Sequence, residues 1–241
     1  MDGVKMGLFI PLPVELKRAT YFNYVNNPVY YFHVYTPKDC LWKVLPEIKK
    51  LTYMMWAFKD TAPSLTGGYS YTPDDKKDVV KKFTYELVTA ISELSKLNFK
   101  TKGIKNIVLL AVPSSKVNKN STIRGCILAI VNVLLKDNSS KKKYLDSKTL
   151  LDGGSVLKRI KDVETTHLTG KSNTYDDLRN SLTVDKMQLP RGCKSEETAY
   201  IILDDVVTTG LNMKVCKDIL TKTGIQPDKI VCLAIAKTER P

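Results

Sequence analysis

Residues 200–212 read Tyr-Ile-Ile-Leu-Asp-Asp-Val-Val-Thr-Thr-Gly-Leu-Asn, so that an apolar run leads directly into two adjacent carboxylates. A short turn of hydroxyl residues and one glycine follows the carboxylates. Beyond the turn, Leu211 to Thr223 carries apolar residues at helical spacing and is followed by Gly224, which predicts a helix and its end. The stretch therefore predicts a buried strand, a polar loop and a helix, the repeating unit of α/β proteins.

The loop of this unit has the chemistry of a site for a phosphorylated sugar. The amides and hydroxyls of Thr208-Thr209-Gly210, with the positive end of the next helix, make a nest for a phosphate dianion. The carboxylates of Asp204 and Asp205 can take the vicinal hydroxyls of a ribose, directly or through Mg²⁺, because oxygen ligands suit that hard cation. The pattern indicates a ribose 5-phosphate site. The alternative is an ordinary strand-turn-helix junction with acidic residues at the strand end.

The order of four apolar residues, Asp204-Asp205, Val206, one residue and Thr208-Thr209-Gly210 resembles the phosphoribosyl pyrophosphate (PRPP) signature of type I phosphoribosyltransferases. Within that family it is most similar to the ComF-type branch. The resemblance implies that the two acids hold the ribose hydroxyls. It also implies that one loop wraps the 5-phosphate, formed by Val207, Thr208, Thr209 and Gly210. The family usually has Thr or Ser two residues after the glycine, where this chain has Asn212, a short polar residue without a hydroxyl.

A second polar loop is expected after the strand predicted from Asn106 to Val112. This loop, Pro113-Ser114-Ser115-Lys116, offers amides, two hydroxyls and one cation, which suit a diphosphate. It looks like the family's pyrophosphate loop, which follows the first strand of the PRPP core. Because ligands of open α/β sheets bind at the carboxyl ends of the strands, both loops are expected at one site. Taken alone, the loop could be an ordinary polar connection.

Three arginines are further candidates for phosphate contacts. Arg124 begins a predicted helix in an Arg-Gly pair that resembles one in ComF-type proteins. Arg159 and Arg179 lie in Leu-Lys-Arg and Leu-Arg-Asn elements that resemble the sequence between the two loops of that branch, although either could be a surface arginine. Residues 138–185 are interpreted as a flexible region that folds over PRPP to exclude water. His167 lies in this region without a partner and is interpreted as incidental.

The prediction for the whole chain is an α/β protein with the type I phosphoribosyltransferase fold, a mostly parallel sheet with flanking helices and an N-terminal cap. Residues 1–100 are expected to form the aromatic-rich cap and covering helices, and residues 101–241 the core. In the first part, Val29 to Tyr35 alternates like a strand, and helices are expected from Leu41 to Lys59 and from Thr72 onward. In the second part, Ile230 to Ala236 reads as a strand buried on both faces.

The composition limits the classes of protein to which this chain can belong. The five cysteines are scattered and odd in number, which indicates reduced thiols and a cytoplasmic location, and the four-cysteine zinc module common in ComF-type proteins is absent. No apolar stretch approaches the length of a membrane span, so no membrane partner is expected. The net charge of +13 suits phosphate-rich or nucleic acid partners, although a lysine-rich proteome would give the same excess.

The resemblance implies a transferase that moves phosphoribosyl from PRPP-Mg²⁺ to an unidentified base or amine and releases pyrophosphate. Asp204 and Asp205 would fix the ribose and Mg²⁺, and Lys116 with Mg²⁺ would neutralise the pyrophosphate. The alternative is a non-catalytic sensor of PRPP or another ribose 5-phosphate-containing nucleotide, or a nucleic-acid-associated component of a DNA-uptake or mobile-element (antiviral) defence system. The sequence leaves open whether the chain forms a homo-oligomer.

Overall fold

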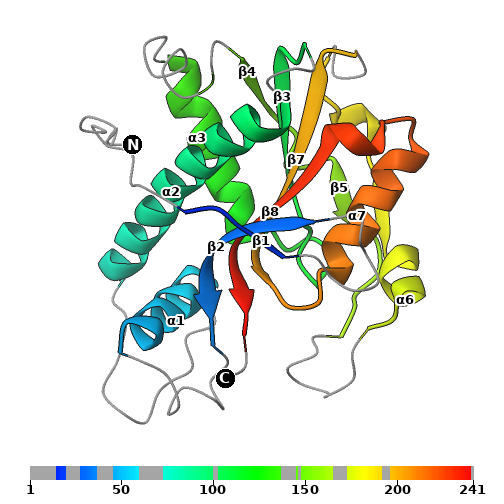
Figure 1. The fold of residues 1–241 in the computed structure, drawn as a ribbon. Coiled ribbons are helices and arrows are strands. Elements are labelled where there is room, and N and C mark those ends of the chain that lie inside the picture. Colours follow the sequence, from blue (N-terminus) through cyan, green and yellow to red (C-terminus); the bar gives the residue numbers. More distant parts are fainter. Residues whose placement is uncertain are drawn as a thin grey trace.

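A six-stranded mixed sheet forms the centre of the protein (Figure 1). The computed structural model describes residues 15–19, 28–36, 46–59, 73–99, 103–136, 145, 148–164, 173–191 and 196–239. The strand order is β1-β2-β8-β7-β3-β4, with β1 Lys17–Ala19, β2 Val29–Tyr35, β3 Asn106–Ala111, β4 Thr149–Asp152, β7 Thr198–Val207 and β8 Ile230–Thr238. Every neighbouring pair is parallel except β1 and β2. The expected α/β class and mostly parallel sheet are confirmed.

Helices cover both faces of this sheet. One face carries α1 (Pro46–Lys59), α2 (Pro73–Phe99) and α3 (Thr122–Lys136). The other carries α7 (Leu211–Lys222), the short α6 (Tyr175–Asn180), and a small antiparallel pair, β5 (Leu157–Arg159) and β6 (Leu182–Val184). Two 3₁₀ turns, Lys186–Gln188 and Pro227–Lys229, complete the described elements.

The central strands are apolar on both sides because both sides are covered. In β7, Ile201 and Leu203 pack in the core under α1, α2 and α3, whereas Tyr200 and Ile202 pack in the core under α7. The run Ile230 to Ala236 in β8 is buried throughout, as its uninterrupted apolar sequence predicts. Because alternate residues of β7 pack against the two helical layers, the strand holds the start of the loop that follows it in a fixed position.

The connections leave β3 and β7 in opposite directions, although these two strands are neighbours. The chain passes from β3 through α3 to β4 on one side, and from β7 through α7 to β8 on the other. This point of reversal is where open α/β sheets form a ligand crevice. Ala111 pairs with Leu203, and the Val112 amide donates to the Leu203 carbonyl at 2.9 Å. The pairing of β3 with β7 therefore ends just before Asp204, and the two chain segments follow separate paths from there.

The first 100 residues contribute to the same sheet and core as the rest of the chain. β2 lies parallel to β8, and α1 and α2 share one hydrophobic core with α3. The strand predicted from Val29 to Tyr35 is confirmed, and the burial of Tyr31 and Phe32 gives these aromatic rings a packing role. The helix expected from Leu41 is observed from Pro46, with residues 41–45 outside the described part. Thr72, where the second helix is expected to begin, also lies outside it.

The region 138–185 differs from the flexible cover that its sequence suggests. Its described parts include β4 within the main sheet, the β5–β6 pair and α6. Leu157, Leu178 and Leu182 from this region are buried against the α7 side of the core. These elements are short, and polar residues interrupt their apolar residues, so the sequence shows no clear strand or helix periodicity there. His167 and residues 137–144 lie outside the described residues.

The cysteines Cys126, Cys216 and Cys232 are free thiols in the core. Burial raises the pKa of Cys126 to about 11 and that of Cys232 to about 12, so both thiols stay neutral and act as small apolar residues. Among the residues that the structure describes, no helix is long and apolar enough to cross a bilayer.

Candidate functional site

The two carboxylates of the β7 end lie in different surroundings. Asp205 forms an ion pair with Lys59 at the end of α1, with 3.1 Å between Nζ and Oδ1. Asp204 lies toward the opposite side, where its charge acts on Arg159, Cys216 and Cys232, and its charge also acts on Lys59. Burial, followed by the charge of Asp205, raises the pKa of Asp204 well above its usual range. The acids are adjacent in sequence, but they face opposite layers of the protein.

The loop after these acids forms an open N-terminus for α7. Gly210 has φ of +74°, a left-handed conformation that glycine adopts without steric cost, and its carbonyl accepts the first helical hydrogen bond from the Lys214 amide at 2.9 Å. Thr208 and Thr209 are exposed, and the Thr209 hydroxyl accepts from the Leu211 amide at 3.4 Å. The amides of Asn212 and Met213 belong to the first turn, which has no carbonyl partners within its own helix. This geometry suits an anion.

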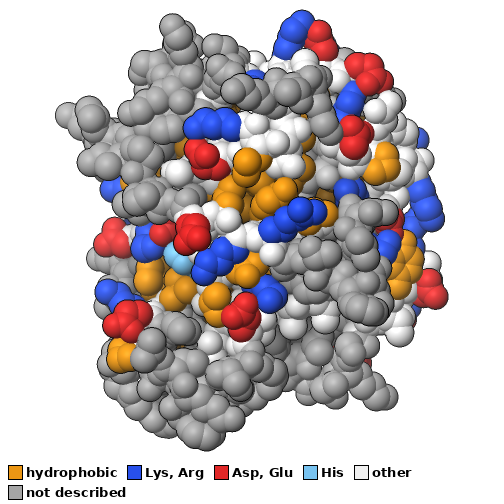
Figure 2. Space-filling view, viewed as in Figure 1, with side chains coloured by type: hydrophobic (Ala, Val, Ile, Leu, Met, Phe, Trp, Pro, Cys, Tyr) orange, Lys and Arg blue, Asp and Glu red, His pale blue; other side chains and the backbone are white. Residues whose placement is uncertain are grey.

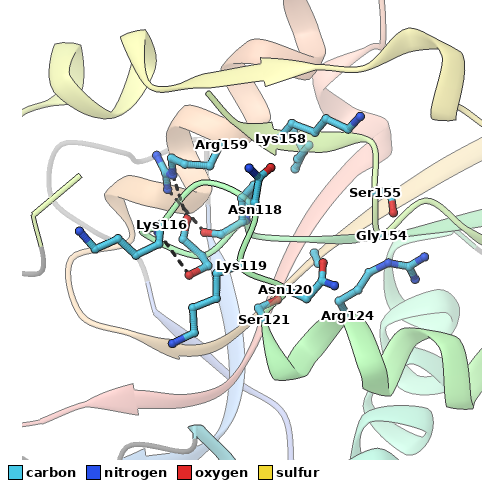
Figure 3. A pocket seen from close by; sticks show the side chains of 14 residues that line it. Lys116, Asn118, Lys119, Asn120, Ser121, Arg124, Gly154, Ser155, Lys158 and Arg159 are labelled. Carbon is cyan, nitrogen blue, oxygen red and sulfur yellow. Dashed lines mark hydrogen bonds between the residues drawn. The ribbon is translucent and has the colours of Figure 1, made fainter. Parts of the chain in front are cut away.

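A pocket of about 330 Å³ opens beside the loop after β3 (Figure 3). Its walls come from the 113–121 loop, the first turn of α3, the turn between β4 and β5, and β5 itself. The lining includes five cations, which are Lys116, Lys119, Arg124, Lys158 and Arg159. Hydroxyls and amide side chains complete the polar lining, including Ser114, Ser121, Asn118 and Asn120. Such a lining suits a ligand with several negative charges.

Arg159 holds the loop after β3 in place. Its Nε donates to the Ser114 carbonyl at 3.0 Å, and Nη1 donates to the Ser181 hydroxyl at 2.5 Å. Nη2 lies 3.5 Å from the Pro113 carbonyl, and Figure 3 shows the guanidinium lying against this loop. The residue is 7% exposed, and burial lowers its pKa, although the charges of Asp162 and Asp204 oppose that effect. Arg159 is thus a buried cation that links the loop after β3 to Ser181 at the end of α6.

Local carboxylates partner three of the five pocket cations within the described ranges. Arg124 donates to Asp152 at 2.7 Å, Lys158 to Asp185 at 2.6 Å, and Lys116 lies 3.1 Å from Asp162. These acids hold the cations in position without lining the pocket themselves. Five cations and three carboxylates leave an excess of two positive charges around this pocket.

Arg124 lies against the backbone of the turn after β4. Figure 3 shows its side chain extending from α3 toward Gly154 and Ser155. A Cβ atom at position 154 would come within 2.6 Å of Arg124 Cδ, so a side chain there would displace the arginine. The Gly154 amide also donates to Asp152 at 2.9 Å, which orients the carboxylate that receives Arg124.

The structure brings together four of the residues proposed from sequence in one pocket: Ser114, Lys116, Arg124 and Arg159. Ser115 lies in the same loop, where its carbonyl accepts from the Val163 amide at 2.9 Å. The β7 set, from Asp204 to Asn212, lies at the neighbouring strand end but does not line the pocket. Arg179 lies on α6 outside the lining, and its buried Nε has no hydrogen-bond partner among the described residues.

Sequence reasoning missed the acids that hold the pocket cations and the lysine that meets Asp205. Asp152 follows the apolar pair Leu150-Leu151 and precedes two glycines, a signal of a strand end that could have revealed it. Lys59 gave no signal, because a lysine in the last turn of an amphipathic helix is ordinary.

Asp204 and Asp205 are two adjacent carboxylates near the end of β7. The described residues contain no group of three or more His, Cys, Asp or Glu side chains that could hold a metal. Mg²⁺, however, is commonly held by one or two carboxylates together with substrate phosphates. In this structure the Lys59 ammonium is the cation that pairs with Asp205.

Basic side chains elsewhere do not gather into one continuous patch on the face seen in Figure 2. Lys and Arg are scattered there among acidic and apolar side chains. Comparison of the sequence with protein-family models gives no match, and a search of curated proteins gives no significant one.

Proposed function

We propose that this chain binds PRPP with Mg²⁺ at the carboxyl ends of β3 and β7 and transfers its phosphoribosyl group to a base or amine. The observation that carries the proposal is that two complementary loops follow neighbouring parallel strands at the point where the sheet connections reverse. One loop borders a pocket with five cations, and the other combines two carboxylates with a Thr-Thr-Gly turn. The type I phosphoribosyltransferase fold belongs to the same proposal.

This arrangement would bind PRPP in one orientation. A diphosphate would lie in the pocket, where Lys116, Arg124 and Arg159 supply positive charge. The 5-phosphate would lie at the start of α7, against the amides and hydroxyls of Thr208, Thr209 and Gly210. The ribose would then span the boundary between the loops, next to Asp204.

The chemistry would rest on positioning and electrostatics. The bond between the ribose C1 and the pyrophosphate oxygen breaks, and its electron pair leaves with pyrophosphate. A new bond forms from C1 to the acceptor nitrogen, and the proton that this nitrogen loses passes to the released pyrophosphate or to solvent. Lys116 and Arg159 would stabilise the leaving group, while Asp204 and Asp205 would hold the ribose hydroxyls and Mg²⁺. Mg²⁺, when bound, would neutralise charge on the pyrophosphate oxygens. The buried Arg159 keeps the loop rigid, so little reorganisation accompanies the reaction.

Pyrophosphate release from PRPP across a panel of purine, pyrimidine and amine acceptors tests the transfer. An enzyme releases pyrophosphate with at least one acceptor and forms the matching nucleotide. PRPP binding without release for any acceptor contradicts transfer and identifies a non-catalytic sensor.

The residue assignment is tested by Asp204→Asn combined with Asp205→Asn. We expect PRPP affinity to fall at least about 100-fold, or about 2.7 kcal/mol, because both ribose and metal contacts are lost. The matched control is Glu93→Gln with Glu197→Gln, which makes the same charge change at an exposed helix position and in the turn just before β7. Equal affinities for the two double variants would contradict the assignment.

Nucleic acid binding through the basic surface remains a separate prediction. A salt series with single-stranded and double-stranded DNA tests it, because release of counterions makes such binding strongest at low salt. Absence of binding at low salt would exclude it.

A further inference from the structure

The end of α1 places a lysine on the acid pair from a distant part of the chain. Lys59 and Asp205 are 146 positions apart, yet Nζ and Oδ1 are separated by 3.1 Å. Their side chains are 30% and 22% exposed, so water and small ions can reach the pair. The contact therefore lies near the carboxyl end of β7, within reach of solvent and not within the closed core.

The fold fixes the position of this lysine. Met55 and Phe58, one turn or less before it, are fully buried. The Thr52 hydroxyl donates to the Thr36 carbonyl and accepts from the Thr36 amide, both at 3.3 Å, and Trp56 Nε1 donates to the Tyr35 hydroxyl at 2.9 Å. These contacts attach α1 to the carboxyl end of β2, so Lys59 is presented to the site by a docked helix.

The surroundings keep this lysine charged. Its ammonium already pairs with the Asp205 carboxylate, with 3.1 Å between Nζ and Oδ1, so the positive charge has a partner in place. The last turn of a helix also favours a positive charge. A compact ammonium ion thus stands where a metal would approach the carboxylate.

We infer that Lys59 is a built-in counter-ion of Asp205, which makes the acid pair a poor site for a free divalent cation. A cation of this kind must displace the ammonium or share Asp205 with it against like-charge repulsion. A cation that arrives with a phosphorylated ligand brings negative charge that can accept the lysine. Lys59 is then a positioning residue that couples metal binding to ligand binding. The inference rests on the proposed function for its purpose, but its test does not involve PRPP.

Titration of the full chain with Mn²⁺ alone, followed by the electron paramagnetic resonance signal of the free ion, provides the test. Lys59→Met should bind Mn²⁺ at least about tenfold more tightly than the wild type, because one unit of repulsion is removed beside the carboxylate. Lys59→Arg retains the charge and should match the wild type. The control Lys105→Met removes the lysine of an exposed ion pair with Glu197 and should also match it.

The gain in Lys59→Met should disappear when Asp205→Asn is added, which would place the new site at this carboxylate. A Mn²⁺ affinity of Lys59→Met within about twofold of the wild type overturns the inference, as does an equal gain in Lys105→Met. Lys59→Gln, with a polar side chain, gives the same test if circular dichroism shows that Lys59→Met is unfolded. Failure of the wild type to bind PRPP refutes the proposed function and leaves this series standing, so the two failures are distinguishable.

Discussion

The loops after β3 and β7 begin side by side, but they handle charge in opposite ways. The β3 side gathers cations and holds them with Asp152, Asp162 and Asp185. The β7 side carries two carboxylates, one desolvated and one paired with a lysine from α1. The difference shows how a parallel sheet separates charge across one crevice. A ligand with a polyanionic end and a hydroxyl-rich middle would be oriented by that separation.

The largest effect is expected from breaking the β3 side at Arg159. Arg159→Met removes the charge and the contacts to Pro113, Ser114 and Ser181. The free energy of unfolding should fall by about 2 to 3 kcal/mol, the scale of hydrogen bonds to a charged group, as measured by urea denaturation. The affinity for inorganic pyrophosphate should fall roughly 100-fold in calorimetry. Arg159→Lys keeps the charge but lacks the planar guanidinium. Its stability and pyrophosphate affinity should therefore lie between those of the wild type and Arg159→Met. Unchanged pyrophosphate binding in Arg159→Met would show that the pocket is not the anion site.

Substitutions at the two adjacent glycines after β4 should have different effects, one on stability and the other on ligand binding. A Cβ at position 153 would lie 2.5 Å from Val108 Cγ1 and 2.7 Å from Leu110 Cδ2, both in the core. Gly153→Ala should therefore lower the free energy of unfolding by about 1 to 3 kcal/mol. Gly154→Ala instead meets the flexible Arg124 side chain, so it should leave stability nearly unchanged and weaken pyrophosphate binding severalfold. The reverse assignment, with Gly154→Ala unfolding the protein and Gly153→Ala silent, would contradict this packing.

On the β7 side, the desolvated carboxylate should cost stability. Because burial and Asp205 raise the pKa of Asp204, its ionised form destabilises the folded state at neutral pH. Asp204→Asn should raise the free energy of unfolding at pH 7 by roughly 1 to 2 kcal/mol while it weakens PRPP binding. The gain should shrink as the pH falls, since the wild-type carboxyl then becomes neutral too. Chemical denaturation at several pH values measures it, and a loss of stability at pH 7 would show that the carboxylate is well solvated or well paired.

The buried carboxylate of Glu86, outside the site, should stabilise the folded state when it is ionised, in contrast to that of Asp204. Burial raises the pKa of Glu86, but the hydrogen bonds from His33 and Lys82 more than offset it, so the pKa is lowered. Its contribution to stability is therefore present above the unfolded pKa and is lost as the pH falls through the folded one. Glu86→Gln should cost about 1 kcal/mol at pH 7 and nothing in acid, with ligand affinity unchanged. A cost that persists unchanged in acid would show that the charge of Glu86 is not what stabilises the fold.

The two strand-loop-helix units were predictable because their signals are local. Apolar runs end in polar loops at Pro113 and Asp204, and parallel pairing then brings the loops together. The partners of the site were not predictable, because Lys59 and Asp205 meet only through the docking of α1 on β2. Arg159 is predicted from sequence as a candidate phosphate contact or a surface arginine, and its burial follows only from the packing of β5 and β6. Short elements such as β4 and β5 carry too few residues for a clear periodicity.

Isothermal titration of the wild-type chain with PRPP in the presence of Mg²⁺ tests the central claim most directly. We predict saturable binding of one PRPP per chain that inorganic pyrophosphate and ribose 5-phosphate each weaken, because each would occupy one of the two loops. Undetectable binding at millimolar PRPP, or binding that neither competitor affects, would contradict a PRPP site between β3 and β7.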